Sequence, residues 1–169
     1  MARKYNIIYA DPPWSYNRKI GRGIAETQYQ TMSIDEIGSI PVNKITAGDA
    51  MLFLWVTFPQ LKEGLSVIES WGFKYKTCAF NWIKQNLKSD TFFVGLGFWT
   101  RSCSEICLLA TKGHPRRVSN NVRQLCSINV NIKMYIFDHL RMYKFAHSSS
   151  CIIYSLKRYD FPVMFITCA

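Results

Sequence analysis

The segment Ile7-Ile8-Tyr9-Ala10-Asp11-Pro12-Pro13-Trp14 (IIYADPPW) decides the fold expected for this chain of 169 residues. Residues 6–10 form a short apolar, β-rich run, and Asp11 followed by two prolines stops it. Proline fixes its own φ and favours an extended residue before it, so the run is typical of a buried strand that ends in an extended turn. Ligands of open α/β sheets bind beyond the carboxyl ends of strands, and Asp11 lies at such an end.

The rest of the first 125 residues alternates between strand and helix patterns. Further strands are expected at 50–56, 73–84 and 105–110, helices at 33–40 and 60–71, and loops at 15–31 and 94–99. Ser33 and Glu36 have the spacing of a capping box, and Gly72 follows the second helix in the usual C-terminal place. The wholly apolar run at 50–56 indicates a central strand buried on both faces. This alternation predicts a single α/β domain with a parallel or mixed sheet.

The composition indicates a basic protein with free thiols. The formal net charge is +10 at pH 7, which favours a polyanion such as nucleic acid as partner. No apolar run reaches the roughly 18 to 20 residues of a membrane span, and the N-terminus lacks a signal-peptide core, so we expect a cytoplasmic protein without membrane contact. Six cysteines occur without a Cys-x-x-Cys pair or a histidine at ligand spacing, so no metal site is predicted.

The residues after the first strand suit chemistry on an exocyclic amine of adenine. That amine is a poor nucleophile, because its lone pair is delocalised into the ring, and hydrogen-bond acceptors must draw it toward tetrahedral geometry. An ionised Asp11 and the backbone carbonyl of Pro12 are such acceptors, and prolines remove N–H donors. Trp14 offers an aromatic face that stacks on a base, a contact worth about 1 to 3 kcal/mol. Taken alone, these four residues suit a polar turn after a strand equally well.

Six blocks in the same order resemble the MT-A70 family of adenine N6-methyltransferases, particularly its bacterial and phage-like members. They are IIYADPPW (7–14), YQTMSIDEI (29–37), LFLWVT (52–57), WGF (71–73), FNWIK (80–84) and SEICLLATKG (104–113). The resemblance implies a Rossmann-like α/β sandwich of three layers with an atypical C-terminal part. It also implies S-adenosylmethionine as the methyl donor and adenine in nucleic acid as the acceptor.

The resemblance assigns site residues one position at a time. It makes Asp11, Pro12, Pro13 and Trp14 the catalytic segment, with Asp11 also close to the methyl donor. Three further residues, expected beside the acceptor site as substrate-binding residues, are Tyr29, Trp82 and Lys84. For each of these three a simpler interpretation remains: a loop tyrosine often packs as a lid, a tryptophan often lies in the core, and a lysine is often a solvated charge.

Two charged features near the fourth strand are left outside the catalytic set. Arg101 and Glu105 match a family pattern, and a structural ion pair bordering the cleft explains them equally well. A basic segment follows, with Lys112, His114, Arg116, Arg117 and Arg123. It suits either a phosphate contact or a solvated loop.

The composition changes at about residue 126. Residues 126–169 contain no glycine and no glutamate, and the family's usual ending, which supplies much of the cofactor pocket, is absent apart from a faint echo at 144–147. A shifted reading frame or a truncated gene would produce such a break. We therefore interpret 1–125 as the MT-A70-like catalytic domain and 126–169 as a divergent tail that is not a separate domain. Losing the closing strands would expose a sheet edge, with which the apolar stretch 151–169 can pair.

The leading hypothesis is methyl transfer from S-adenosylmethionine to the N6 amine of adenine in DNA, with activity impaired by the atypical tail. DNA is favoured over RNA, although no base-reading motif separates the two. The alternative from another class of function is a non-catalytic nucleic-acid-binding or partner subunit with the same fold.

Overall fold

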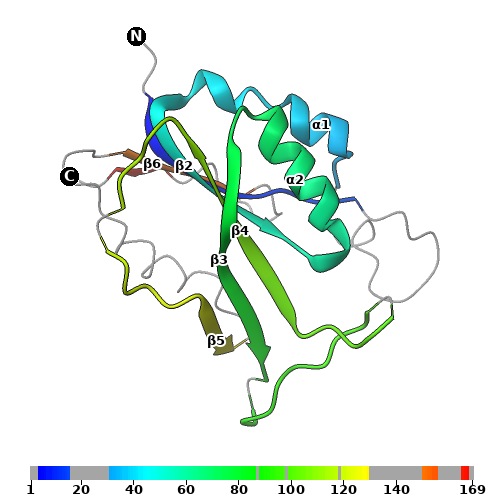
Figure 1. The fold of residues 1–169 in the computed structure, drawn as a ribbon. Coiled ribbons are helices and arrows are strands. Elements are labelled where there is room, and N and C mark those ends of the chain that lie inside the picture. The colour runs from blue at the N-terminus through cyan, green and yellow to red at the C-terminus, as the bar shows by residue number, and fades with distance from the viewer. Residues whose placement is uncertain are drawn as a thin grey trace.

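The structure, a computed structural model, describes residues 4–15, 31–86, 88–97, 99–117, 119–129, 150–155 and 165–167. These residues form a sheet in the order β5-β3-β4-β2-β1-β6-β7. Its strands are β1 Tyr5–Asp11, β2 Thr46–Val56, β3 Lys74–Gln85, β4 Ser104–Lys112, β5 Leu125–Asn129, β6 Ser150–Ser155 and β7 Phe165–Thr167. The α-helices are α1 Ile34–Ser39 and α2 Leu61–Ser70, with 3-10 turns at Val42–Lys44 and Phe58–Gln60 (Figure 1).

The sheet is mixed, which confirms the predicted class. Strand β1 runs parallel to β2 and to β6, and β3 runs parallel to β5. Strand β4 is antiparallel to both of its neighbours, β2 and β3, and β7 is antiparallel to β6. Strands β5, β3, β2, β1 and β6 therefore share one direction and end at one edge of the sheet. We call this the carboxyl edge; it includes Asp11, Val56 and Gln85 and the beginning of β4.

Helices α1 and α2 pack together on one face of the sheet (Figure 1). The predicted capping box opens α1: the Glu36 backbone N–H donates to Ser33 Oγ at 3.3 Å, and the Ser33 N–H donates to a Glu36 carboxylate oxygen at 2.7 Å. Helix α2 ends before Gly72, whose φ of +78° lies in the left-handed region that favours glycine. Both signals read from the sequence are thus confirmed. The described residues supply one helical layer, so the three-layer sandwich stays a prediction.

Strand β2 has apolar side chains on both faces, as its sequence predicts. Leu52, Leu54 and Val56 belong to the core beneath the helices, whereas Met51, Phe53 and Trp55 belong to a second core on the opposite face. Side chains alternate between the two faces of a strand, so the continuous apolar run supplies both cores.

Helix α2 approaches β2 most closely at Gly64. A Cβ added there would lie 2.5 Å from Val56 Cγ1 and 3.6 Å from Leu108 Cδ1, so the glycine permits the close packing of helix on sheet. This contact holds α2 directly above the strand that ends beside Asp11.

Part of the divergent tail lies in the sheet. Residues 151–155 of β6 pair in parallel with 7–11 of β1, so β1 has a partner on each side. Most of the expected loop at 15–31 lies outside the described residues. Within the described part of the chain, no helix is long and apolar enough to cross a membrane.

Candidate active site

Asp11 ends β1 at the carboxyl edge and is 8% exposed. Pro12, Pro13 and Trp14 follow it and are buried as well. The neighbours of β1 hold this end in place, because β2 and β6 pair with the strand up to Ala10 and Asp11 respectively. The sequence-predicted catalytic segment therefore begins at the end of a strand in the middle of the sheet.

The backbone after Asp11 offers acceptors and no unused donors. Pro12 and Pro13 have no N–H groups. The Trp14 N–H donates to the Pro12 carbonyl at 2.9 Å, and the Ser15 N–H donates to the Met32 carbonyl at 3.2 Å. A carbonyl oxygen has two lone pairs, so that of Pro12 retains acceptor capacity beside the Asp11 carboxylate.

Met32, which follows the expected loop at 15–31, also anchors this turn. Its N–H donates to the Pro13 carbonyl at 2.9 Å, which completes a short parallel bridge between Trp14 and Met32. The Gln60 side-chain amide donates to the Ser15 carbonyl at 2.7 Å. The segment is consequently fixed by partners from two later parts of the chain, one before α1 and one before α2.

The structure places Trp14 in the core beneath the helices. Its side chain is 4% exposed, and its indole N–H donates to the backbone carbonyl of Trp55 at 3.0 Å. This bond ties the turn after β1 to the end of β2. A stacking contact between Trp14 and a base stays a prediction.

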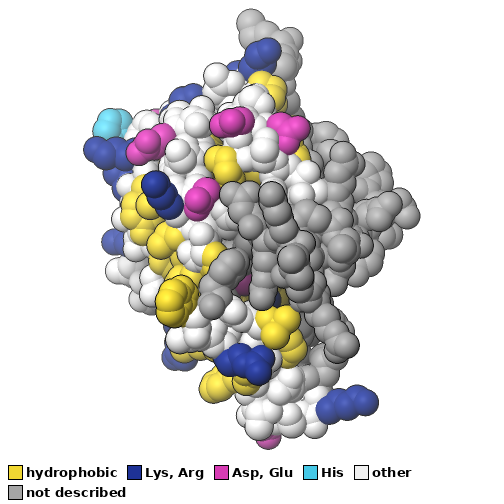
Figure 2. Space-filling model, turned by 90° about the vertical axis from the view of Figure 1, so that its right-hand side faces the viewer, with side chains coloured by type: hydrophobic (Ala, Val, Ile, Leu, Met, Phe, Trp, Pro, Cys, Tyr) yellow, Lys and Arg dark blue, Asp and Glu magenta, His cyan; other side chains and the backbone are white. Residues whose placement is uncertain are grey.

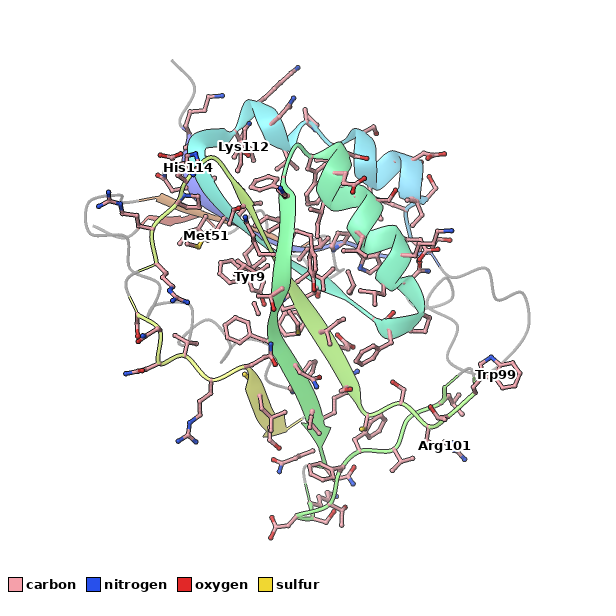
Figure 3. The ribbon with its side chains drawn as sticks, in the orientation of Figure 1. Tyr9, Met51, Trp99, Arg101, Lys112 and His114 are labelled. Atoms are coloured by element: carbon pink, nitrogen blue, oxygen red, sulfur yellow. The ribbon has the colours of Figure 1, made fainter. Side chains whose placement is uncertain are left out.

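Three aromatic side chains line the opposite face beside Asp11. The Trp55 indole N–H donates to the Tyr9 hydroxyl at 2.5 Å, and the Trp55 ring meets the Tyr9 and Trp82 rings edge-to-face with centroids 6.4 Å apart in both cases. Trp82 is buried in this second core, and a contact between its ring and a substrate stays a prediction. Figure 3 labels Tyr9 in the middle of the sheet.

Lys84 forms an ion pair with Glu105 that the sequence did not predict. Lys84 Nζ lies 2.7 Å from Glu105 Oε1 and 5.2 Å from the Trp82 ring centroid, within the range of a cation–π contact. The expected partner of Glu105, Arg101, is exposed in the loop before β4. The pairing follows from the antiparallel register, which sets Trp82 of β3 opposite Glu105 of β4.

Tyr9 interacts electrostatically with Asp11 of its own strand and with Glu105 of the ion pair. Burial raises the pKa of Tyr9 well above its ordinary value, electrostatic interactions with Cys107, Asp11 and Glu105 add to the increase, and the hydrogen bond from Trp55 opposes it. Asp11 follows Tyr9 by two residues and so shares its face of β1. Tyr9 is bonded to Trp55, the Trp55 ring meets Trp82, and Lys84 lies over the Trp82 ring, so these side chains form a connected group on the face of the sheet that Asp11 shares. Tyr29 lies outside the described residues.

The basic segment starts at the other end of β4. Lys112 and His114 lie far from Trp99 and Arg101 (Figure 3), and the His114 backbone N–H donates to Asp49 Oδ1 at 2.8 Å. The arginines of this segment are exposed. Their contact with phosphate stays a prediction. Among the described residues, no group of three or more histidine, cysteine or acidic side chains is arranged to hold a metal ion.

The model of the MT-A70 family matches residues 5–147. The chain belongs to the MT-A70 family. The match includes the Asp11 turn, the aromatic side chains and the ion pair, and it extends past Leu125, where the motifs read from the sequence end. MT-A70 methyltransferases use S-adenosylmethionine.

Two proteins similar to this chain differ in the function that their names describe. The chain is 36% identical over 147 residues to the Type II methyltransferase M.MunI of Mycoplasma sp, a match covering 75% of this chain and 60% of that protein. It is 28% identical over 122 residues to the N6-adenosine-methyltransferase non-catalytic subunit MTB of Arabidopsis thaliana, covering 68% of this chain and 15% of that protein. The chain thus matches only part of each relative, and the name of one of them describes a non-catalytic subunit.

The described residues of this MT-A70 member fit the methyl donor of the family at one position. The sulfonium of S-adenosylmethionine is positively charged, and Asp11 provides a carboxylate at the carboxyl ends of parallel strands, where ligands of such sheets bind. The chemistry of this side chain therefore suits the cationic part of the cofactor. No other cofactor contact is assigned to the described residues.

Proposed function

We propose that this chain transfers the methyl group of S-adenosylmethionine to the N6 amine of adenine in DNA. The observation that carries the proposal is the turn after β1, where the Asp11 carboxylate and the Pro12 carbonyl stand together and the backbone N–H groups of Trp14 and Ser15 are already bonded. This turn, which we call the acceptor turn, accepts hydrogen bonds and donates none. An amine bearing two hydrogens is the ligand that it fits.

The reaction needs the amine to gain nucleophilic character at nitrogen. In our proposal Asp11 accepts one N6 hydrogen and the Pro12 carbonyl accepts the other, which draws the nitrogen lone pair out of conjugation. Both hydrogen bonds strengthen as positive charge grows on N6, so they stabilise the transition state more than the ground state. S-adenosylmethionine supplies the electrophilic methyl group when it is bound. The Asp11 carboxylate is placed to take the proton that N6 must then lose.

The neighbouring aromatic and charged side chains position the base and its strand. We assign substrate binding to Tyr29, Trp82 and Lys84, of which Tyr29 rests on the family resemblance alone. The ion pair with Glu105 orients Lys84 over the Trp82 ring, so its charge is held at the edge of the site. Ordered cations near a site attract the phosphates of an incoming strand.

The choice of DNA over RNA rests on similarity alone. Similarity to the Type II methyltransferase M.MunI favours DNA. The formal charge of +10 serves either phosphate backbone. Labelled methyl transfer from S-adenosylmethionine to unmethylated DNA and to RNA of the same sequence, run side by side, tests this choice. We expect label in the adenine of DNA; label in RNA alone would make RNA the substrate.

A non-catalytic partner subunit is the second candidate, favoured by similarity to the non-catalytic subunit MTB. The divergent tail adds weight to it, since we propose that residues 126–169 replace much of the family's cofactor pocket and reduce activity. Calorimetry separates the candidates. Saturable binding of S-adenosylmethionine supports the enzyme, whereas binding of nucleic acid without any cofactor signal supports the partner subunit.

A further inference from the structure

The loop between β3 and β4 carries an unusual concentration of exposed apolar side chains. The exposed residues are Phe92, Phe93, Val94, Leu96 and Trp99. Trp99 is 100% exposed. Single exposed apolar residues are common on protein surfaces, but a contiguous group marks a contact site. This loop therefore has a surface suited to a binding partner.

Backbone hydrogen bonds give the loop a defined shape. The Phe93 N–H donates to the Lys84 carbonyl and the Gly95 N–H donates to the Ser102 carbonyl, both at 2.8 Å. At the tip, a Cβ on Gly97 would overlap the Thr100 carbonyl oxygen, so only glycine fits there. Beside this close approach of Gly97 to Thr100, Trp99 points outward (Figure 3).

The loop stands at the same edge of the sheet as the acceptor turn. It leaves β3 directly after Lys84 and Gln85, and it returns to the sheet at Ser104. Asp11 ends β1 at this edge. A nucleic acid strand held at the Asp11 turn would therefore extend along the edge that carries the loop.

Positive charge accompanies the aromatic tip. Arg101 lies two residues after Trp99, and both Arg101 and Lys88 are exposed. The loop also contains one acidic residue, Asp90. In the lower part of Figure 2, where Figure 1 places this loop, hydrophobic and basic side chains lie next to each other. Apolar rings beside cations suit a nucleic acid, whose bases stack and whose phosphates are anionic.

We propose that Trp99 is a base-stacking wedge, which enters duplex DNA next to the adenine that is to be methylated, while Arg101 contacts the adjoining phosphate. The proposal rests on the proposed function and names its substrate as a duplex. An amine inside a base pair cannot reach Asp11 unless the nucleotide leaves the stack, which costs a few kcal/mol. An aromatic side chain that fills the vacated space offsets part of that cost.

The tryptophans of the chain allow a direct test. Of the five, Trp14, Trp55, Trp71 and Trp82 are buried, so Trp99 alone meets solvent. Wild-type emission minus that of Trp99→Phe isolates the signal of Trp99. The titrant is sheared unmethylated plasmid DNA, first as duplex and then heat-denatured. Filter retention measures binding of the same samples.

Duplex DNA should remove at least about half of the Trp99 signal, since a stacked indole is quenched and leaves solvent. Acrylamide should then quench the remaining signal less than in the free protein. Trp99→Ala should bind duplex about tenfold more weakly, the loss of one stacked ring. The matched control is Tyr75→Ala, which removes an exposed aromatic residue near the start of β3 and should leave duplex binding unchanged.

Retention of duplex by the filter with an unchanged Trp99 signal would overturn the wedge. So would a Trp99 signal that depends on protein concentration without DNA, which identifies a second copy of the chain as the occupant. Equal loss of duplex and denatured DNA binding in Trp99→Ala would show a general contact instead of a wedge. None of these readouts needs cofactor or turnover, so a failed wedge leaves the methyl-transfer proposal standing, and absent methyl transfer leaves the wedge test valid.

Discussion

Lys84 Nζ and Glu105 Oε1 lie 2.7 Å apart, and this ion pair joins β3 to β4 at the carboxyl edge of the sheet. The side chains are 23% and 14% exposed, so the pair is partly shielded from solvent. Its position at the carboxyl edge gives it a role in orienting Lys84 as well as in stability. Replacing Glu105 separates these two contributions.

Glu105→Gln should raise the KM for DNA more than it lowers kcat, because Lys84 loses the partner that holds it over Trp82. The free energy of unfolding should fall by no more than about 1 kcal/mol, as for other solvent-accessible ion pairs. Steady-state kinetics and urea unfolding measure the two effects. Glu69→Gln, on the exposed side of α2, is the control. An unchanged KM would show that the pair does not position Lys84.

Tyr9→Phe should change how stability depends on pH. The folded protein raises the pKa of Tyr9 through burial first and then through Cys107 and Asp11, whereas an unfolded tyrosine titrates at about 10. Because the pKa of Tyr9 is higher in the folded protein, Tyr9 contributes stability that is fully present below about pH 10 and is lost as pH rises further. Unfolding free energies measured across that range should therefore fall less in Tyr9→Phe than in wild type.

Near neutral pH the same variant should lose about 1 to 3 kcal/mol, because the buried Trp55 indole N–H loses its hydroxyl acceptor. Tyr75→Phe is the matched control, since Tyr75 is exposed. Parallel loss of stability above pH 10 in wild type and Tyr9→Phe would remove Tyr9 as the cause.

Gly64→Ala should destabilise the protein despite the better helix propensity of alanine. The gain of about 1 kcal/mol from propensity is outweighed by a Cβ placed 2.5 Å from Val56 Cγ1, since overpacking typically costs about 1 to 3 kcal/mol. Thermal unfolding should show a lower Tm. Gly48→Ala is the control, because a Cβ there meets nothing within 4 Å. Adding Val56→Ala should relieve the overlap and recover part of the lost Tm. A higher Tm for Gly64→Ala alone would contradict the packing described.

Trp14→Ala should reduce stability as well as activity. The side chain is 4% exposed and its indole N–H is bonded to the Trp55 carbonyl, so truncation leaves a large cavity and costs about 3 to 5 kcal/mol. Urea unfolding checks this value. Trp14→Phe retains much of the ring volume and should recover most of the stability. A stable, folded Trp14→Ala would show that Trp14 is not a core residue.

The local elements could be predicted because short-range chemistry determines them. The capping box of Ser33 and Glu36, the left-handed Gly72 and the doubly buried β2 each depend on residues close together in the chain. Asp11 could be placed at a strand end for the same reason. Together these features locate the acceptor turn in the fold.

Long-range pairings could not be predicted. The partner of Glu105 depends on the register of β3 against β4, which shifts at two irregularities before it reaches Trp82. The bond from the Trp14 indole to Trp55 joins residues 41 positions apart. The apolar stretch 151–169 could be expected to pair with an exposed sheet edge, and residues 151–155 do pair with β1, but no local pattern specifies β1 as the neighbour.

The most direct test of the account is methyl transfer by Asp11→Asn, with Asp35→Asn as the matched control on the exposed first turn of α1. Label from S-adenosylmethionine is counted in unmethylated duplex DNA, and circular dichroism verifies that each variant is folded. Loss of the carboxylate should lower the rate at least about 100-fold, because one acceptor for the charge that develops on N6 is gone. Asp35→Asn should match wild type. If folded Asp11→Asn keeps more than about half of the wild-type rate, the carboxylate does not act on the amine and the central claim fails.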